Sequence, residues 1–487
     1  MILSPGQQRR RKPLATTQAL PAVVILGAAA GILVLSFPET VQLIMAVLVI
    51  LGVILSMLKL EWGLLVLVFI TYTRFSDIAI AYHGAPSIAK SFILVLLTAI
   101  LLRWFLHGKG PRGWERAGLL ICLFGILILA STFYAADPQR TRFAFVSFVK
   151  NGVIVLIISL LLQSNATFRQ LIWTLLAAGI FMGSITVLQY LTGTFQNNYG
   201  GFAQYDVMHI VGDTSGQRVS GPLGDPNFYA QIMLTLIPLA LDRLWSETRF
   251  FPRLAAFWAL TVCSLTVLFT FSRGAFLAMA AMILLVLLFR PPPITTILLM
   301  LALLMLLIPF LPEEYTARMM TLRELRPDLQ SGLTGEDSFR GRTSELWSAW
   351  LMFKDYPLRG VGFNNFPLHY RDYSRQLGLA PQLQERAAHN LYLEIAAELG
   401  LIGLAVFGLI LWQAGNAVSK TYQVFCQLGR VDDARRVISF GLGVSGYLLA
   451  AFFIHDAYPR YLWLLLGICL ALPNILPESR GERENHA

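Results

Sequence analysis

Charged residues are scarce in this chain: only 14% of its 487 residues are Asp, Glu, Lys or Arg, whereas 56% are hydrophobic. This balance indicates an integral membrane protein rather than a soluble one. Cysteine is scarce as well. The four cysteines lie in or beside apolar segments without paired spacing, which supports neither disulfides nor a zinc site. We interpret them as small buried hydrophobic residues.

Motifs that bind metals, nucleotides and nucleic acids are also missing. The sequence has no His-Glu-x-x-His motif, no glycine-rich phosphate loop and no basic–aromatic module for nucleic acid. We therefore expect no metal, no cofactor and no nucleic-acid partner. The formal net charge of +10 falls mainly on segments predicted to face the cytoplasm, where basic residues meet the anionic head groups of membrane lipids.

Long apolar runs fill most of the chain. A spanning helix needs about 20 apolar residues, so the runs predict an all-α, polytopic transmembrane helix bundle of about 12–14 spans. The predicted spans are residues 19–37, 41–59, 62–80, 86–106, 117–135, 142–163, 166–192, 225–246, 252–271, 274–289, 293–311, 390–414, 434–454 and 459–475.

These spans suggest four parts. The parts are N-terminal transmembrane helices (1–192), transmembrane helices with an outer loop and an arginine turn (193–311), a long periplasmic loop with short amphipathic helices (312–388) and C-terminal transmembrane helices (389–487). Lys and Arg concentrate in one set of short loops and span ends, and the positive-inside rule places this set in the cytoplasm. We therefore predict both termini on the cytoplasmic side and interpret the basic N-terminus as leading into an uncleaved first helix.

A histidine stands where the long polar loop meets an apolar helix. The polar stretch cannot lie in lipid, so His389 is expected at the membrane surface, held by the helix and reachable from water. Glu394 and Glu398 lie on one face of this helix, at a depth where carboxylates usually face a bundle interior or a wet cavity. The alternative is an interfacial histidine beside two carboxylates that extend to the surface.

Two arginines precede this junction on the predicted outer side. Asp225 or Asn227 is expected to cap the next helix, whereas no capping role accounts for Arg218. Arg273 interrupts an apolar run, where an arginine costs ~2.5–3.5 kcal/mol on insertion scales. A helical hairpin that turns at Gly274 would place Arg273 at the outer end of the bundle.

The long loop adds two more arginines, Arg340 and Arg342. The periodicity after Arg342 predicts an amphipathic helix that rests on the membrane surface, and its apolar residues are Leu346, Trp347, Trp350, Leu351 and Phe353. Arg218, Arg273, Arg340, Arg342 and His389 thus all reach the outer face. Arginine binds phosphate bidentately, and histidine exchanges a proton near neutral pH. Together they could hold a lipid-linked phosphate while the histidine activates a hydroxyl.

The ordered set of motifs resembles the O-antigen ligase and O-antigen polymerase family over about residues 210–410. The motifs are Gly224-Asp225-Pro226-Asn227, Ser272-Arg273-Gly274, Arg342 to Trp347 with Pro357-Leu358-Arg359-Gly360-Val361-Gly362, and His389-Asn390-x-Tyr392-Leu393 with Glu398-x-Gly400-Leu401-Ile402-Gly403. The resemblance implies a metal-independent glycosyltransferase of the bacterial inner membrane. Such an enzyme takes a glycan from undecaprenyl diphosphate at the periplasmic face and passes it to lipid A core or to another lipid-linked glycan.

By the same resemblance, His389 is the general base, and Arg273 with Arg342 or Arg340 holds the diphosphate. Attack from the face opposite the diphosphate would invert the anomeric carbon. Asn390, Glu394 and Glu398 would support the site. The alternative function is an inorganic-carbon or other solute transporter of the same superfamily, in which buried charges line a pathway. The chain shows no convincing internal repeat, and its 77-residue outer loop exceeds what a permeation path needs.

Overall fold

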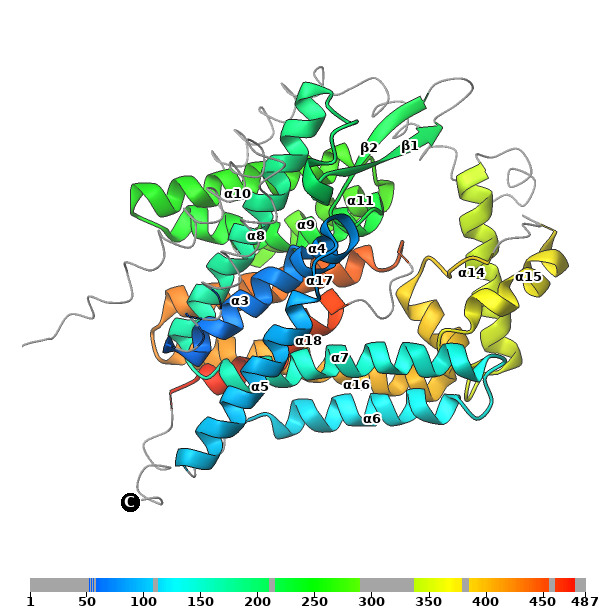
Figure 1. Ribbon diagram of the computed structural model, residues 1–487, viewed down its shortest axis with the longest axis horizontal. Helices are drawn as coiled ribbons and strands as arrows, with labels where there is room; N and C mark the ends of the chain where they lie inside the picture. Colours follow the sequence, from blue (N-terminus) through cyan, green and yellow to red (C-terminus); the bar gives the residue numbers. More distant parts are fainter. Residues whose placement is uncertain are drawn as a thin grey trace, which may run out of the picture.

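The computed structural model describes residues 52, 54, 56, 58–107, 113–209, 215–289, 337–378, 385–454 and 460–477. These ranges are almost entirely helical (Figure 1), as the apolar runs predict. They contain five helices long and apolar enough to cross a membrane, or six if the bent pair α3–α4 forms one span. The shorter helices α11 and α18 are apolar as well. The predicted all-α, polytopic architecture is confirmed.

The helices follow the predicted spans closely. The helices are α3 (Leu60–Tyr72), α4 (Phe75–His83), α5 (Ile88–His107), α6 (Glu115–Ser131), α7 (Pro138–Leu161), α8 (Asn165–Thr192), α9 (Pro226–Ser246), α10 (Phe250–Phe269), α11 (Arg273–Phe289), α14 (Asp337–Asp355), α15 (Phe366–Leu377), α16 (Leu391–Gln427), α17 (Val431–Ala450) and α18 (Arg460–Ala471). The predicted spans 19–37 and 293–311, and most of 41–59, lie outside the described residues. The predicted span 62–80 is bent by 53° between α3 and α4, where Arg74 has a left-handed backbone (φ 53°).

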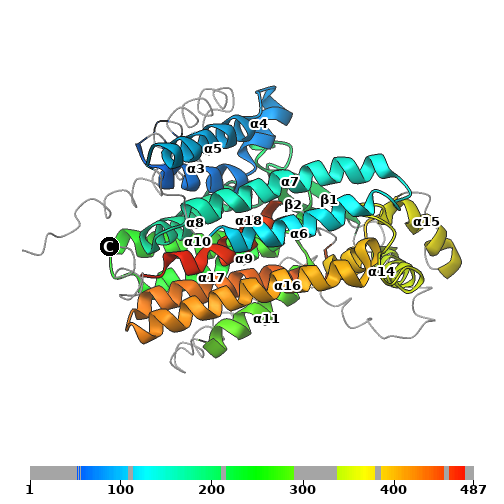
Figure 2. The same cartoon turned by 90° about the horizontal axis from the view of Figure 1, so that it is seen from below.

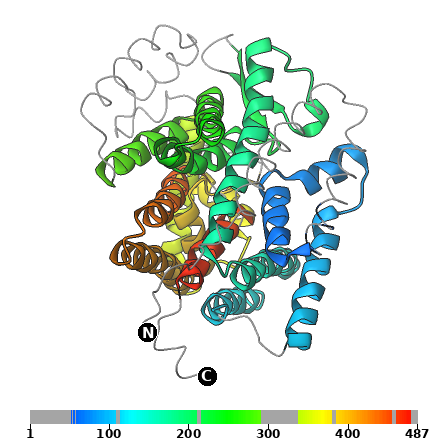
Figure 3. The ribbon, with the colours of Figure 1, turned by 90° about the vertical axis from the view of Figure 1, so that its left-hand side faces the viewer.

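The bundle is elongated, and its two amphipathic helices lie at one end. Helices α14 and α15 pack on each other and on α16, beyond the ends of α6 and α7 (Figure 2). Viewed along the bundle, the α3–α5 group lies on one side and α16–α17 on the other, with α8 and α18 between them (Figure 3). The helix predicted after Arg342 is α14, and Trp347 and Trp350 are exposed on it, as contact with a membrane surface requires.

Helix α8 forms the centre of the bundle because small residues let its neighbours approach closely. In the most apolar 18-residue stretch of this helix, 89% of the residues are buried. A Cβ on Gly179 would meet Leu236 of α9, and one on Gly183 would meet Val262 of α10. Small residues at helix contacts give membrane helices close van der Waals packing.

The loop 193–224, which is predicted to lie on the outer side, contains an element that the sequence did not predict. Strands β1 (Gln204–His209) and β2 (Ser215–Gly221) form an antiparallel hairpin in which Asp206 pairs with Arg218. The loop lacks the alternation of apolar and polar residues that marks a half-buried strand. Its strands are instead fixed by contacts to the helix ends described below.

Helix α16 is broken at Gly400, whose φ of 64° and ψ of −160° are not helical. The two amide groups that follow Gly400 donate to the carbonyl oxygens of Pro357 (2.8 Å) and Leu358 (3.4 Å). The carbonyl oxygens at positions 397 and 398, just before Gly400, accept hydrogen bonds from the amides of Val361 (2.8 Å) and Gly362 (2.9 Å), respectively. The loop after α14 thus satisfies the backbone groups that the break leaves open, as membrane depth requires.

We expect Gly400→Ala to destabilise the protein strongly. Its backbone conformation is nearly exclusive to glycine, at a cost of about 1–3 kcal/mol for other residues, and a Cβ would collide with the carbonyl group of Leu358. The apparent Tm of the purified variant should therefore fall. Gly408→Ala is the matched control on the same helix, since a Cβ there meets nothing within 4 Å and alanine favours a helix. Equal Tm values for the two variants would contradict this view of the break.

Candidate active site

A helical hairpin turns beside Arg273, as the interrupted apolar run predicts. The turn comes before this residue and not at Gly274, which lies in the first turn of α11. Helix α10 ends at Phe269, and α11 begins at Arg273. Phe271 makes the turn with a left-handed backbone (φ 51°). Arg273 is only 9% exposed, so the protein surrounds its side chain at the end of the bundle.

Arg218 braces this turn from strand β2. Its Nε donates to the carbonyl oxygen of Thr270 (2.8 Å), and its Nη2 donates to Oδ1 of Asn227 (3.0 Å). Asp225 caps α9 as predicted, because its Oδ1 accepts from the amides of Asn227 and Phe228. Arg218 therefore ties the hairpin to the end of α10 and the start of α9.

Two other predicted arginines, Arg273 and Arg342, lie within electrostatic range of Arg218. Burial lowers the pKa of Arg218 to about 10, and the carboxylates of Asp206 and Asp225 oppose this shift. The positive charges of Arg342 and Arg273 lower the pKa further. Arg342, from α14, thus lies within electrostatic range of a hairpin more than a hundred residues earlier in the chain. Arg340 is also on α14, but its side chain lies outside the described part.

His389 stands directly before α16, as the sequence predicts. Asn390 is the N-cap of the helix, and its Oδ1 accepts from the amides of Tyr392 and Leu393, both at 3.0 Å. His389 itself has a left-handed backbone (φ 48°), and its side chain is 27% exposed. Such a conformation costs energy in a residue other than glycine and often marks a functional site.

The segment Ala451–Phe453, which follows α17, joins the histidine junction to the arginine turn. The Nδ2 of Asn390 donates to the carbonyl oxygen of Phe452 (3.1 Å), and the amide of Leu391 donates to that of Ala451 (3.0 Å). On the other side, a Cβ on Gly274 would lie 2.5 Å from the Cβ of Phe453. The two motifs, more than a hundred residues apart in sequence, therefore pack on the same three residues.

A carboxylate that the sequence reasoning missed faces His389. Glu345 of α14 is fully buried, and its Oε2 lies 2.8 Å from Nδ1 of His389. Its Oε1 accepts from Nη1 of Arg386 (2.9 Å). Arg342 and Glu345 are three residues apart, which puts them on one face of a helix. The spacing from Arg342 could therefore have drawn attention to Glu345. Its contact with His389 was not predictable, because sequence alone does not show that α14 packs on the start of α16.

Both carboxylates of α16 are buried, and the partners of Glu398 are known. Glu398 is fully buried and accepts from the amides of Asn364 (2.7 Å) and Phe366 (3.1 Å). It thereby holds the loop that fills the break in α16. Glu394 is buried in the first turn of that helix. Within the described ranges, no three His, Cys, Asp or Glu side chains come together as a metal site requires.

A comparison with known families settles what kind of domain carries this geometry. Residues 257–408 match the sequence profile of the O-antigen ligase family. This part of the chain is similar to O-antigen ligases. It contains Arg273, Arg342, Glu345 and His389, and it runs from α10 into α16, past the break at Gly400. No curated protein matches the chain.

This match confirms the resemblance that the motifs gave. Together with the apolar helices, the match supports a multi-pass inner-membrane protein of the general type that transfers glycans. Arg218 lies outside the matched range, in the hairpin that braces the domain. The braced turn, α14 and the start of α16 form the candidate active site.

Proposed function

We propose that the protein transfers a glycan from undecaprenyl diphosphate to an acceptor hydroxyl at the periplasmic face of the membrane. The observation that carries this proposal is that the neighbours of Arg273 and His389 pack on the same segment, Ala451–Phe453. Arg342 lies on the same helix face as Glu345, which contacts His389. A lipid-linked diphosphate has the charge that such arginines bind. The histidine is partly exposed and can reach a hydroxyl.

Arg273 and Arg342 hold the diphosphate in this proposal. Their guanidinium groups form bidentate bonds to phosphate oxygens, and these bonds strengthen as the leaving diphosphate gains charge in the transition state. The electrostatic link between Arg342 and Arg218 supports Arg342 in this role. Arg218 keeps the turn in place, since two of its nitrogens already donate to protein atoms.

His389 acts as the general base. Nδ1 faces the carboxylate of Glu345 and the carbonyl oxygen of Ala387 (3.3 Å). Both are acceptors and favour the tautomer that carries its proton on Nδ1, so that Nε2 is the basic nitrogen. Nε2 takes the proton of the acceptor hydroxyl as its oxygen attacks the anomeric carbon. The bond from that carbon to the diphosphate breaks, and the diphosphate leaves with the electron pair. Attack opposite the leaving group inverts the anomeric centre, and no metal takes part.

The break in α16 gives no support to the alternative, a solute transporter. Broken helices in transporters leave backbone groups that coordinate the substrate. At Gly400 those groups are bonded to the loop at residues 357–362. The acceptor is lipid A core in a ligase and a second lipid-linked glycan in a polymerase. The surface glycans of a deletion strain distinguish a ligase from a polymerase. Loss of attachment and loss of chain extension give different ladders of glycan sizes on a gel.

The role of Glu345 leads to a test of the base. Glu345→Gln keeps the size of the side chain but removes the charge that faces Nδ1, so we expect transfer to slow by at least about tenfold, as when a catalytic histidine loses its orienting carboxylate. Glu345→Asp should retain more activity than Glu345→Gln. Glu385→Gln is the matched control, because it removes an exposed carboxylate paired with Arg140. A rate for Glu345→Gln equal to that of the control would remove Glu345 from the mechanism.

The periplasmic placement is tested by labelling. In a chain without native cysteines, Lys354→Cys on α14 and Ser419→Cys on α16 both offer exposed positions. We expect an impermeant thiol reagent to label Lys354→Cys in intact spheroplasts and Ser419→Cys only after lysis. Labelling of both from the same side would overturn the proposed orientation, and the diphosphate chemistry would then need a donor in the other leaflet.

A further inference from the structure

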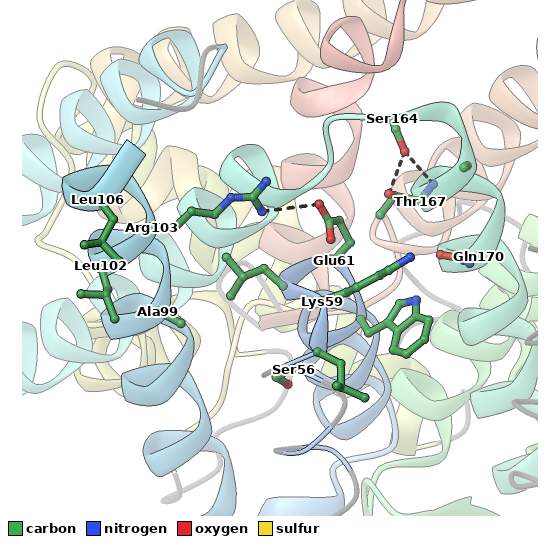
Figure 4. Close-up of a pocket in the computed structure, with 14 residues that line it drawn as sticks. Ser56, Lys59, Glu61, Ala99, Leu102, Arg103, Leu106, Ser164, Thr167 and Gln170 are labelled. Atoms are coloured by element: carbon green, nitrogen blue, oxygen red, sulfur yellow. Dashed lines mark hydrogen bonds and ion pairs between the residues drawn. The ribbon is translucent and has the colours of Figure 1, made fainter. Parts of the chain in front are cut away.

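A pocket that contains charged residues lies at the far end of helix α8 from the arginine turn. It has a volume of about 740 Å³ and is lined by the start of α3, the last turns of α5 and the start of α8 (Figure 4). The other end of α8 carries Tyr190, which packs on Phe271 of the arginine turn. The helix has 28 residues, or about 42 Å at 1.5 Å per residue, so the pocket is separate from the candidate active site.

Basic groups outnumber acidic ones in the pocket. Lys59, at the start of α3, is exposed. Arg103 of α5 has a side chain that is 60% exposed and points into the pocket, toward Glu61 (Figure 4). The carboxylate of Glu61 is 3.7 Å from Arg103. Two cations and one carboxylate leave a net positive charge. The Ser164 hydroxyl, at the start of α8, adds a further polar group at the rim.

One wall of the pocket is apolar and faces lipid. Leu102 and Leu106 of α5 line it, and both are exposed. Only 17% of the most apolar window of α5 is buried, so lipid surrounds most of this helix. A polar, positively charged space that continues into a lipid-facing apolar wall fits an amphiphile with an anionic head group and an acyl chain.

We propose that this pocket binds an anionic glycerophospholipid. Its phosphodiester lies between Lys59 and Arg103, and an acyl chain follows Leu102 and Leu106 along α5. The lipid comes from the cytoplasmic leaflet, the side to which the distribution of Lys and Arg assigns this end of the bundle. The bound lipid links α5, which has few buried residues, to the ends of α3 and α8.

Native mass spectrometry of the full chain with added phosphatidylglycerol tests the site. The double variant Lys59→Gln/Arg103→Gln should bind the lipid about 30-fold more weakly, a factor of five to six for each basic residue near an anionic head group. The control is Arg116→Gln/Lys420→Gln, which removes two exposed basic residues outside the pocket and should leave the affinity unchanged. Equal losses in the two double variants would overturn the proposal.

Two further measurements separate a lipid from a soluble anion. Leu106→Glu keeps both basic residues but places a negative charge on the apolar wall, and it should also weaken phosphatidylglycerol binding relative to the control. Glycerol phosphate, which has no acyl chain, should not displace the lipid from the wild-type protein. Displacement by glycerol phosphate, or full lipid affinity in Leu106→Glu, would show that the pocket takes a soluble phosphate instead.

Discussion

His389→Ala is expected to reduce glycan transfer by about 10²–10⁴-fold, the usual contribution of a general base. In the described residues, the imidazole of His389 lies at the start of α16, and the carboxylate of Glu345 faces its Nδ1. The arginine turn packs on Ala451–Phe453, the segment that also bonds to Asn390. The purified, reconstituted variant should be assayed with a lipid-linked donor and an acceptor.

His369→Ala is the matched control for this experiment. His369 is on α15, in the same predicted periplasmic region, and burial lowers its pKa while Asp372 opposes the shift. It contacts none of the groups that position His389 in the account above, so its alanine variant should transfer glycan at close to the wild-type rate. A His389→Ala rate within a few fold of His369→Ala would reduce His389 to an interfacial residue and restore weight to the transporter alternative.

Arg273→Lys and Arg342→Lys are each expected to slow transfer by about 10²–10³-fold, as does removal of one preorganised donor at a site where charge develops. Lysine keeps the positive charge but lacks the planar fork that binds two phosphate oxygens at once. The loss should therefore appear in turnover, while the protein still accumulates in the membrane.

Arg371→Lys provides the control for the arginine variants. Arg371 is an exposed arginine on α15, in the same predicted periplasmic region as Arg342. It is not one of the arginines proposed to bind the diphosphate, so Arg371→Lys should leave the transfer rate nearly unchanged. If Arg273→Lys and Arg342→Lys resemble this control, both residues are structural. The diphosphate contact would then pass to Arg340, because Arg218 already donates to Thr270 and Asn227.

Residue patterns were sufficient for features that depend on local sequence. The cap at Asp225, the turn beside Arg273 and the helix start after His389 all follow from neighbouring residues, and the structure confirms each. Apolar runs likewise predicted the helices, since a membrane leaves few other solutions for a buried backbone. The positions of these features were therefore readable before any contact between them was known.

Features that depend on contacts between distant segments were not readable. The break at Gly400 has its cause about forty residues earlier, in the loop that supplies its hydrogen bonds. Glu345 meets His389 only because α14 packs on the start of α16. Glu398 was expected to face the interior and is buried, but its bonds to the amides of Asn364 and Phe366 were not predictable. In each case the partner is set by tertiary packing, and helical periodicity carries no information about it.

The central claim is that two arginines hold the diphosphate and a histidine performs the transfer, and donor binding without turnover tests it most directly. Undecaprenyl diphosphate should be titrated against the wild-type protein, His389→Ala and Arg273→Lys/Arg342→Lys, for example by microscale thermophoresis in detergent. The account predicts nearly wild-type affinity for His389→Ala and clearly weaker binding for the double arginine variant. Full affinity in the arginine variant, or loss of binding in His389→Ala, would contradict it.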